Sequence, residues 1–182
     1  RVFWGLKLKY PTAVSGSYAN TALGWDRQDL SETYPQGSRI VYEFPAREQM
    51  PAVKVCWYDG GLLPDVPEEM EPDRPLSLGG GMIFVGDKGK LLNGTQLIPY
   101  SRMKDSPRPE KTIPRITTTH EMNWVNACKN GGRAEADFDF AGPLTEMVVM
   151  GNLSLFYPGR KLRWDGEKMQ VTNLPEANQL VN

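Results

Sequence analysis

Several short segments of this chain alternate between the two faces of an extended strand, and this feature most constrains its fold. Every second residue from Ile40 to Phe44 is a large apolar residue. Residues 52–58 repeat the pattern, with Trp57 on the face of two valines and Tyr58 on the opposite face. A period of two is typical of a strand with one buried face. Both segments are therefore predicted to be strands.

Two further segments have the pattern of a strand, a tight turn and a second strand. In residues 82–92 the turn is Gly86–Gly89, and in residues 162–171 it is Asp165-Gly166. Residues 13–22 alternate more loosely and predict another strand. Strands joined by short turns pair in the antiparallel direction. No helix alternates with these strands, as a parallel, doubly wound sheet would require, so the sequence predicts a mainly antiparallel sheet.

Two helices are predicted late in the chain. The first is expected over residues 118–130, because Thr118 and Glu121 have the spacing of a capping box and a glycine pair follows. The second is expected over residues 143–156, since Pro143 suits a first helical turn. This second helix has little polar face and is expected to be buried against the sheet. Strands followed by helices in separate blocks predict the α+β class.

The length and charge of the chain restrict its organisation and its partners. At 182 residues, one domain with its own hydrophobic core is expected over residues 1–182, with two small domains as the alternative. No apolar run approaches the length that spans a bilayer. The formal net charge of -1 gives no electrostatic reason to expect nucleic acid or an anionic membrane as a partner.

Two long irregular segments stand out between the predicted strands and helices. Residues 60–81 are acidic and rich in proline, whereas residues 95–115 are basic. Loops of this length inside a compact domain are uncommon, and they are usually functional or disordered. Each segment is therefore expected either to line a site or to lack fixed structure.

Most catalytic and metal-binding patterns are missing from the sequence. His120 is the single histidine, so a multi-histidine metal site is excluded, and Cys56 and Cys128 form no paired motif. The preference of free cysteine for protein interiors favours two buried thiols, with a disulfide or a reactive thiol as the alternative. Gly79-Gly80-Gly81 and Gly86-Asp87-Lys88-Gly89 are typical of turns and do not match nucleotide-binding loops. The sequence therefore identifies no catalytic residue, and His120 is either a polar surface residue or a titrating site residue.

The segment Cys56-Trp57-Tyr58-Asp59-Gly60-Gly61 is the most suggestive of a site, because it ends a strand and enters the acidic loop. Aromatic rings offer a flat apolar face, and a carboxylate accepts hydrogen bonds from hydroxyl groups. Such a combination suits a sugar or another polyol. The alternative is that Trp57 belongs to the core and Asp59-Gly60 only makes a turn.

Ten short motifs follow one another along the chain. They are W-G-L-K-L-K-Y-P-T at 4–12, E-T-Y-P at 32–35, Y-E-F-P-A-R at 42–47, W-Y-D-G-G at 57–61, F-V-G-D-K-G-K-L at 84–91, H-E-M-N-W-V-N-A-C at 120–128, F-D-F-A-G-P-L-T-E at 138–146, G-N-L-S-L at 151–155, L-R-W-D at 162–165 and E-A-N at 176–178. Together they resemble the C-terminal domain of Gfo/Idh/MocA-family oxidoreductases, in a branch common in Bacteroidetes and related bacteria. The resemblance covers essentially the whole chain.

The resemblance implies a missing partner domain. Proteins of this family place a dinucleotide-binding Rossmann domain first, with a catalytic lysine and an Asp/His pair that lie before the position of Arg1 in this chain. No catalytic or cofactor-binding residue can therefore be carried over to this sequence. NAD or NADP is expected to bind the longer protein and not this chain alone.

The resemblance also implies the remaining fold and role. It predicts an open antiparallel sheet with helices packed on one face, which lines the substrate pocket and supplies much of a homo-oligomer interface. The expected substrates are sugars or sugar-like polyols, and the net reaction is either dehydrogenation or redox-assisted glycoside cleavage. From their positions in loops and at strand ends, the residues expected to face the substrate are Tyr58, Asp59, Arg102, His120 and, behind them, Tyr34.

Two alternatives from other classes stay open. The chain could be a free-standing carbohydrate-binding module that uses Trp57 and Tyr58 as a stacking platform. It could instead be a purely structural domain whose exposed sheet face serves to dimerise. The compartment, bacterial cytoplasm or periplasm, is also left open by the sequence.

Overall fold

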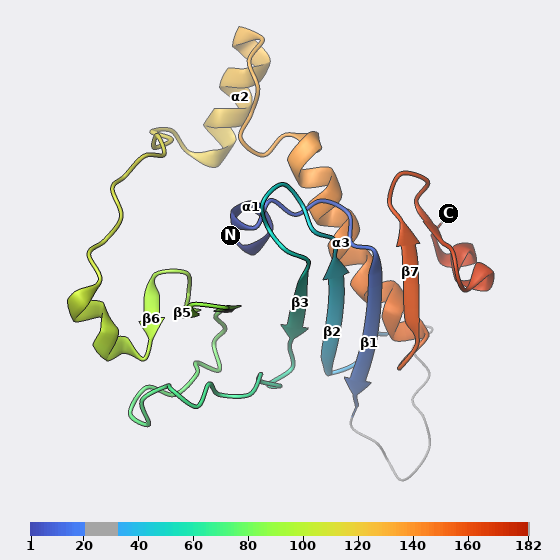
Figure 1. Cartoon of the computed structure of the whole chain (residues 1–182). Coiled ribbons are helices and arrows are strands. Elements are labelled where there is room, and N and C mark those ends of the chain that lie inside the picture. Colours follow the sequence, from blue (N-terminus) through green and yellow to red (C-terminus); the bar gives the residue numbers. More distant parts are fainter. Residues whose placement is uncertain (21–32, 182) are drawn as a thin grey trace. The chain divides into compact units, whose positions relative to one another are not determined.

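Figure 1 shows the computed structural model of the chain, which describes residues 1–20 and 33–181. The described chain forms two compact units. One comprises Arg1–Leu62 with Thr117–Asn182, and the other comprises Leu63–Ile116. The expectation of one domain over residues 1–182 stays a prediction.

The first unit is built on an antiparallel sheet, which confirms the predicted α+β class with an open, mainly antiparallel sheet. Each strand runs antiparallel to its neighbours. From one edge to the other, the described strands are β3 (Val53–Tyr58), β2 (Gly37–Phe44), β1 (Ala13–Ala19), β7 (Lys161–Asp165) and β8 (Gln170–Val171).

The core of this unit lies between the sheet and one long helix. Ile40, Tyr42 and Phe44 of β2 are buried, as their alternation predicts. Helix α3 (Phe138–Phe156) packs on β1 and β2 and crosses the sheet in Figure 1. Near its start, Phe140 meets Phe3 of the short helix α1 (Val2–Gly5) edge to face, with ring centroids 5.7 Å apart. One face of the sheet is thus covered, whereas many outward side chains of the strands remain exposed.

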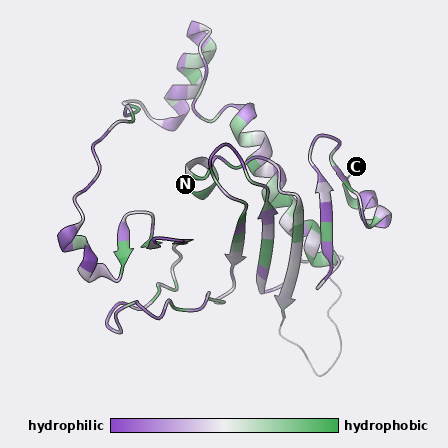
Figure 2. Ribbon diagram, viewed as in Figure 1, coloured by the Kyte–Doolittle hydropathy of each residue, from purple (hydrophilic) through white to green (hydrophobic). Residues whose placement is uncertain are grey.

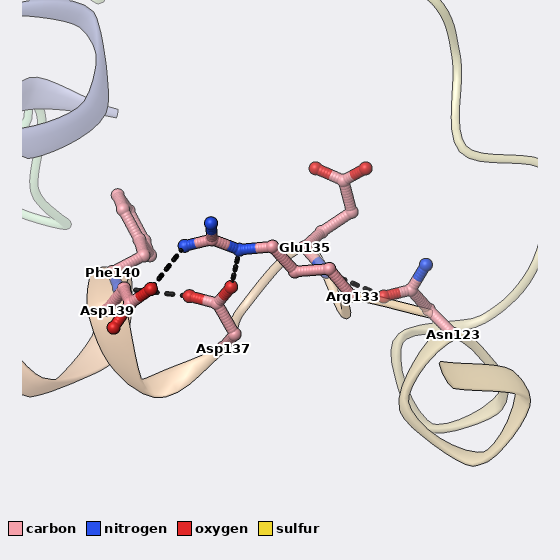
Figure 3. A network of polar contacts seen from close by, with 6 residues as sticks. All are labelled: Asn123, Arg133, Glu135, Asp137, Asp139 and Phe140. Atoms are coloured by element: carbon pink, nitrogen blue, oxygen red, sulfur yellow. Dashed lines mark hydrogen bonds and ion pairs between the residues drawn. The ribbon is translucent and has the colours of Figure 1, made fainter. Parts of the chain in front are cut away.

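Helix α3 begins five residues before its predicted start at Pro143. Asp137 caps it by accepting a hydrogen bond from the Phe140 amide, and the Arg133 guanidinium contacts both Asp137 and Asp139 (Figure 3). Pro143 removes one main-chain hydrogen bond inside the helix. The cap and the ion pairs stabilise the turns before it, so the helix starts earlier than a first-turn proline would indicate.

The expectation that α3 is largely buried holds only for its C-terminal part. Its buried residues are Met150, Gly151, Leu153, Ser154 and Leu155. Val148 and Val149 are more than half exposed, although both are apolar. An apolar composition therefore did not distinguish the sheet-facing side from the outer side of this helix.

Helix α2 (His120–Asn130) ends as predicted, with Gly131 in the left-handed conformation. Its N-cap is Thr119, which accepts a hydrogen bond from the Met122 amide, and not Thr118 as the capping-box spacing predicted. None of its residues is buried, and hydrophilic and hydrophobic residues are both spread along it (Figure 2). The side chain of Asn123 accepts a hydrogen bond from the Glu135 amide, which ties α2 to the segment before α3 (Figure 3).

Both predicted hairpins are present. In the first unit, β7 and β8 pair, and β8 is covered by the 3-10 helix η2 (Pro175–Leu180), whose Asn178 side chain hydrogen-bonds both the N–H and the C=O of Val171. In the second unit, β4 (Ile83–Gly86) and β5 (Gly89–Leu92) pair across a two-residue turn. These glycines therefore form a hairpin turn, as expected.

The second unit contains more regular structure than predicted. Residues 95–115 include strand β6 (Gln96–Ile98), which pairs with β5, and the 3-10 helix η1 (Tyr100–Asp105), so this segment is not wholly irregular. Residues 60–81 form no helix or strand, as predicted. Their acidic part is held by Glu71, whose carboxylate accepts hydrogen bonds of 3.0 Å from the Tyr100 and Ser101 amides. Among the described residues, no helix is long and apolar enough to cross a membrane.

Candidate functional site

The carboxylate of Asp59 organises the end of the sheet where β2 begins and β3 ends. It accepts hydrogen bonds from the Ser38 amide at 2.5 Å, the Ser38 hydroxyl at 2.9 Å and the Trp57 indole Nε1 at 2.9 Å. Ser38 is only 3% exposed, so one anchor of this network is fixed inside the protein. Hydrogen bonds to a charged acceptor are stronger than neutral ones. Asp59 therefore acts first as a link between the two strands and the indole ring.

Trp57 is 55% exposed, so the alternative in which it belongs to the core is wrong. It lies opposite Ile40 in the register of β2 and β3 and thus on the α3 side of the sheet, at the edge strand. Because Asp59 holds its indole N–H, the ring is exposed but fixed in direction. An exposed ring with a fixed direction is able to stack on a flat apolar partner.

Tyr58 lies on the opposite face of the sheet from Trp57, because successive side chains of a strand alternate. It pairs with Arg39 of β2, whose Nε donates to the Tyr58 hydroxyl at 3.3 Å and whose guanidinium carbon is 5.6 Å from the ring centroid. The binding-module alternative assumed that Trp57 and Tyr58 form one stacking platform. Because the two rings lie on opposite faces of the sheet, they cannot do so. Within this segment, Trp57 is the ring that the Asp59 network orients.

The chain turns sharply directly after Asp59, and Gly60 is required there. Its φ is +61°, and a Cβ atom at this position would lie 2.1 Å from the Gln36 carbonyl oxygen. The close approach of residues 36–37 to residue 60 brings Asp59 within reach of Ser38. The turn predicted from Asp59-Gly60 is thus correct, and it coexists with the exposed tryptophan.

Asn20, at the end of β1, adds a polar group to this end of the sheet. Its Oδ1 accepts a hydrogen bond of 3.2 Å from the Gln36 amide, which fixes the orientation of the side-chain amide. Its Nδ2 is buried without a hydrogen-bond partner in the described structure. Buried donors without a partner are uncommon in folded proteins.

The five residues expected to face a substrate are not all brought together. Tyr58 and Asp59 are neighbours on opposite sides of the β3 end, and exposed Tyr34 precedes Gln36 at the same end of the sheet. His120 is the first residue of α2. Arg102 lies in η1 of the second unit. A substrate role for each of the five stays a prediction, and Asp59 is the one whose environment is best defined.

Ser38 and Asn20 were missed by the sequence interpretation. Ser38 looks like an ordinary strand residue, and its contact with Asp59 depends on strand pairing between residues 21 positions apart. Asn20 closes a loosely alternating segment that gave no polar signal. One signal could have identified Ser38. It lies directly before the alternating residues of one predicted strand, and Asp59-Gly60 lies directly after those of the next, so antiparallel pairing brings the two together.

The outer face of the sheet, opposite α3, carries charged residues that meet across β1. Lys161 of β7 lies 2.8 Å from Glu43 of β2, and Lys54 of β3 lies 3.7 Å from the same carboxylate oxygen. Contact over β1 is possible because Ala13 and Ser15 between them are small. The hydrogen bond from Lys161, followed by the charges of Lys161 and Lys54, lowers the pKa of Glu43 below its usual range.

Both cysteines are exposed, so the expectation of two buried thiols is wrong. Cys56 lies on the outer face of β3, opposite Val41, and Cys128 lies on α2, which has no buried residue. In the described part of the chain, no group of three or more His, Cys, Asp or Glu residues could hold a metal ion.

Comparisons of the chain with models of protein families, with curated protein sequences and with solved structures found no match. The resemblance to the Gfo/Idh/MocA family therefore stays a prediction based on the motifs.

Proposed function

We propose that this chain is the substrate-binding and oligomerisation domain of a larger NAD(P)-dependent oxidoreductase that acts on sugars or sugar-like polyols. The observation that carries the proposal is the strand end at Asp59, where a fixed carboxylate holds an exposed tryptophan ring beside a polar sheet edge. The open antiparallel sheet with one helix-covered face is consistent with the fold that the motif resemblance implies. The proposal includes no catalytic residue in this chain.

In the proposed enzyme, this chain supplies shape and contacts for the substrate. A hydride would pass between a hydroxyl-bearing carbon of the sugar and a nicotinamide, and a base of the dinucleotide-binding domain would take the hydroxyl proton. Gly86 and Gly89 belong to the β4–β5 hairpin and match no nucleotide-binding loop. Binding of NAD or NADP is therefore assigned to the upstream domain.

The test is a titration with NADH, followed by its fluorescence, of two proteins: this chain and the product of the same gene extended upstream. The extended protein is expected to bind NADH, and this chain is expected not to bind it. If neither protein binds, or if the gene encodes no upstream extension, the oxidoreductase assignment is wrong.

A free-standing carbohydrate-binding module is the second candidate, and the fixed and exposed ring of Trp57 favours it. It predicts that this chain binds a sugar by itself and that the gene begins close to Arg1. A purely structural dimerisation domain would bind neither NADH nor sugar. The same pair of proteins therefore separates all three candidates when sugar binding is measured beside NADH binding.

A further inference from the structure

The arrangement at the end of β3 points to Trp57, and not Asp59, as the residue that carries a sugar contact. We propose that the exposed face of the Trp57 indole binds the ring of a neutral sugar, and that Asp59 is a positioning residue which holds the indole for this purpose. The proposal rests on the sugar-binding part of the proposed function. It needs none of the redox chemistry.

The Asp59 carboxylate is already engaged by groups of the protein itself. A carboxylate offers about four acceptor positions, and three of those of Asp59 are taken by the Ser38 amide, the Ser38 hydroxyl and the Trp57 indole. A sugar hydroxyl that competed for these positions would break the link between β2 and β3. At most one acceptor position, on Oδ1, is left for a hydroxyl group.

The ring of Trp57 is organised before any ligand arrives. Trp57 is held at its backbone by pairing with β2 and at its indole N–H by Asp59. Asp59 is in turn held by Ser38, which is buried. Fixing a side chain in its bound conformation reduces the entropy lost on binding and so strengthens binding. An exposed tryptophan with a mobile side chain would lack this advantage.

The surroundings of Trp57 indicate the chemical class of its ligand. Protein partners are recognised by wide apolar patches, but of the three β3 residues on this face Val53 and Val55 are half-buried and only Trp57 is exposed. The cation nearest in the register, Arg39, lies on the other face and contacts Tyr58. An exposed aromatic face beside one acceptor fits a ring with an apolar face and neutral hydroxyl groups, which describes a pyranose.

The experiment labels the five tryptophans of the chain with 5-fluorotryptophan and follows them by fluorine NMR. The probes are the methyl glycosides of glucose, galactose and mannose. The resonance that disappears in Trp57→Phe is expected to be the one that shifts when sugar is added. Trp57→Ala is expected to weaken binding at least about tenfold, and Trp57→Phe, which keeps a flat ring, is expected to weaken it less.

Trp124→Ala is the matched control, because Trp124 is 62% exposed, on α2, and far from the Asp59 network in the chain. It is expected to leave sugar binding unchanged. Asp59→Ala is expected to narrow the Trp57 resonance in the absence of sugar and to weaken sugar binding while Trp57 is still present. If Asp59 served only to stabilise the fold, its loss would not narrow the Trp57 resonance and weaken sugar binding together. If Asp59→Ala does not fold, Trp57→Phe still tests whether the Trp57 ring makes the sugar contact.

The proposal is overturned if a different tryptophan responds to sugar, if Trp57→Ala binds as tightly as the original chain, or if none of the three glycosides binds. Its failure is distinguishable from failure of the proposed function. Sugar binding through Trp57 without NADH binding by the extended protein leaves this inference standing and removes the oxidoreductase. If the extended protein binds NADH and Trp57→Ala binds sugar as tightly as the original chain, the oxidoreductase proposal stands and this inference is wrong.

Discussion

Two glycines let α3 lie directly on the sheet. A Cβ atom on Gly16 of β1 would lie 2.4 Å from the Ser154 hydroxyl oxygen, and one on Gly151 of α3 would lie 2.2 Å from the Tyr42 hydroxyl oxygen. Interiors are close-packed, so a single added methyl group at such a contact must displace its neighbours. The position of the helix, and with it the shape of the core, depends on these residues.

Gly151→Ala is therefore expected to destabilise the first unit by about 1–3 kcal/mol, because α3 must move away from Tyr42 and Ile40. Gly142→Ala in the same helix is the matched control, since nothing lies within 4 Å of its added Cβ. The control is expected to be neutral or stabilising by up to about 1 kcal/mol. Urea unfolding measures both, and equal effects of the two substitutions would contradict the packing described.

Tyr42 is expected to make the first unit less stable at alkaline pH. Burial raises the pKa of its hydroxyl from 10.0 to about 12. Between these values the unfolded chain loses a proton that the folded chain keeps, so stability falls as pH rises, by about 2–3 kcal/mol at pH 12. Urea unfolding at pH 8 and at pH 11 measures the first part of this loss, about 1.4 kcal/mol. Tyr42→Phe is expected to reduce it, and an identical loss in this variant would show that other groups cause it.

Whole elements were predictable where one local pattern determined them. The buried positions of β2 follow from its alternation, and both hairpins follow from their turn residues. Helix starts were less predictable, because a cap is a choice between adjacent polar residues. Thr118 and Thr119 are identical in type, and the early start of α3 depends on Asp137 and Arg133, whose contacts form only in the folded chain.

The sequence predicted those site residues that belong to the end of strand β3, and it did not predict the contacts that they make. The sequence indicated Trp57 and Asp59 from their place at the end of an alternating segment. It could not indicate that Asp59 is occupied by Ser38, because that contact depends on the register between β2 and β3. It also could not place Arg102 or His120 relative to Asp59, since long irregular segments separate them.

The cap of α2 gives a test with neighbouring threonines. Thr119→Ala removes the side chain that accepts from the Met122 amide and is expected to destabilise α2 by about 1 kcal/mol. Thr118→Ala is expected to have little effect. Amide hydrogen exchange of Met122 and Asn123 measures local opening of the helix. Faster exchange in Thr118→Ala than in Thr119→Ala would reinstate the capping box predicted from the sequence.

At the scale of the whole molecule, the two units differ in how they are held together. The first has a continuous core of buried side chains between sheet and helix. In the second, the described buried apolar residues are Met70 and Ile98. Polar contacts supplement this small core, namely the Glu71 hydrogen bonds, the Lys90–Glu69 ion pair and the guanidinium of Arg74 stacked 3.7 Å over the Tyr100 ring.

Glu71→Gln is expected to loosen the acidic segment from η1, because the amides of Tyr100 and Ser101 lose a charged acceptor. These two amides lower the pKa of Glu71 below its ordinary value of 4.5. Their stabilising effect is therefore complete above pH 4.5 and is lost as pH falls through the lower folded-state value. Hydrogen exchange of the two amides, compared with that in Glu68→Gln, measures the change. Equal protection in both variants would contradict the contact.

The outer face of the sheet is where the oligomer proposal can be tested. Val41 and Cys56 lie opposite each other there, and the charged residues of β2, β3 and β7 on this face are Arg39, Glu43, Lys54, Lys161, Arg163 and Asp165. If two copies associate through this face, their excess positive charges repel each other. Salt screens such repulsion, so the dimer is expected to tighten as ionic strength rises.

Val41→Glu is expected to give a monomer in sedimentation velocity, because it replaces an apolar side chain at the proposed interface with a charged one that loses its hydration on burial. Val85→Glu is the control, since Val85 is 73% exposed and lies in β4 of the second unit. A chain that is monomeric at every salt concentration would remove oligomerisation from the proposed function. A dimer that Val85→Glu disrupts and Val41→Glu does not would instead move the interface from the outer face to the second unit.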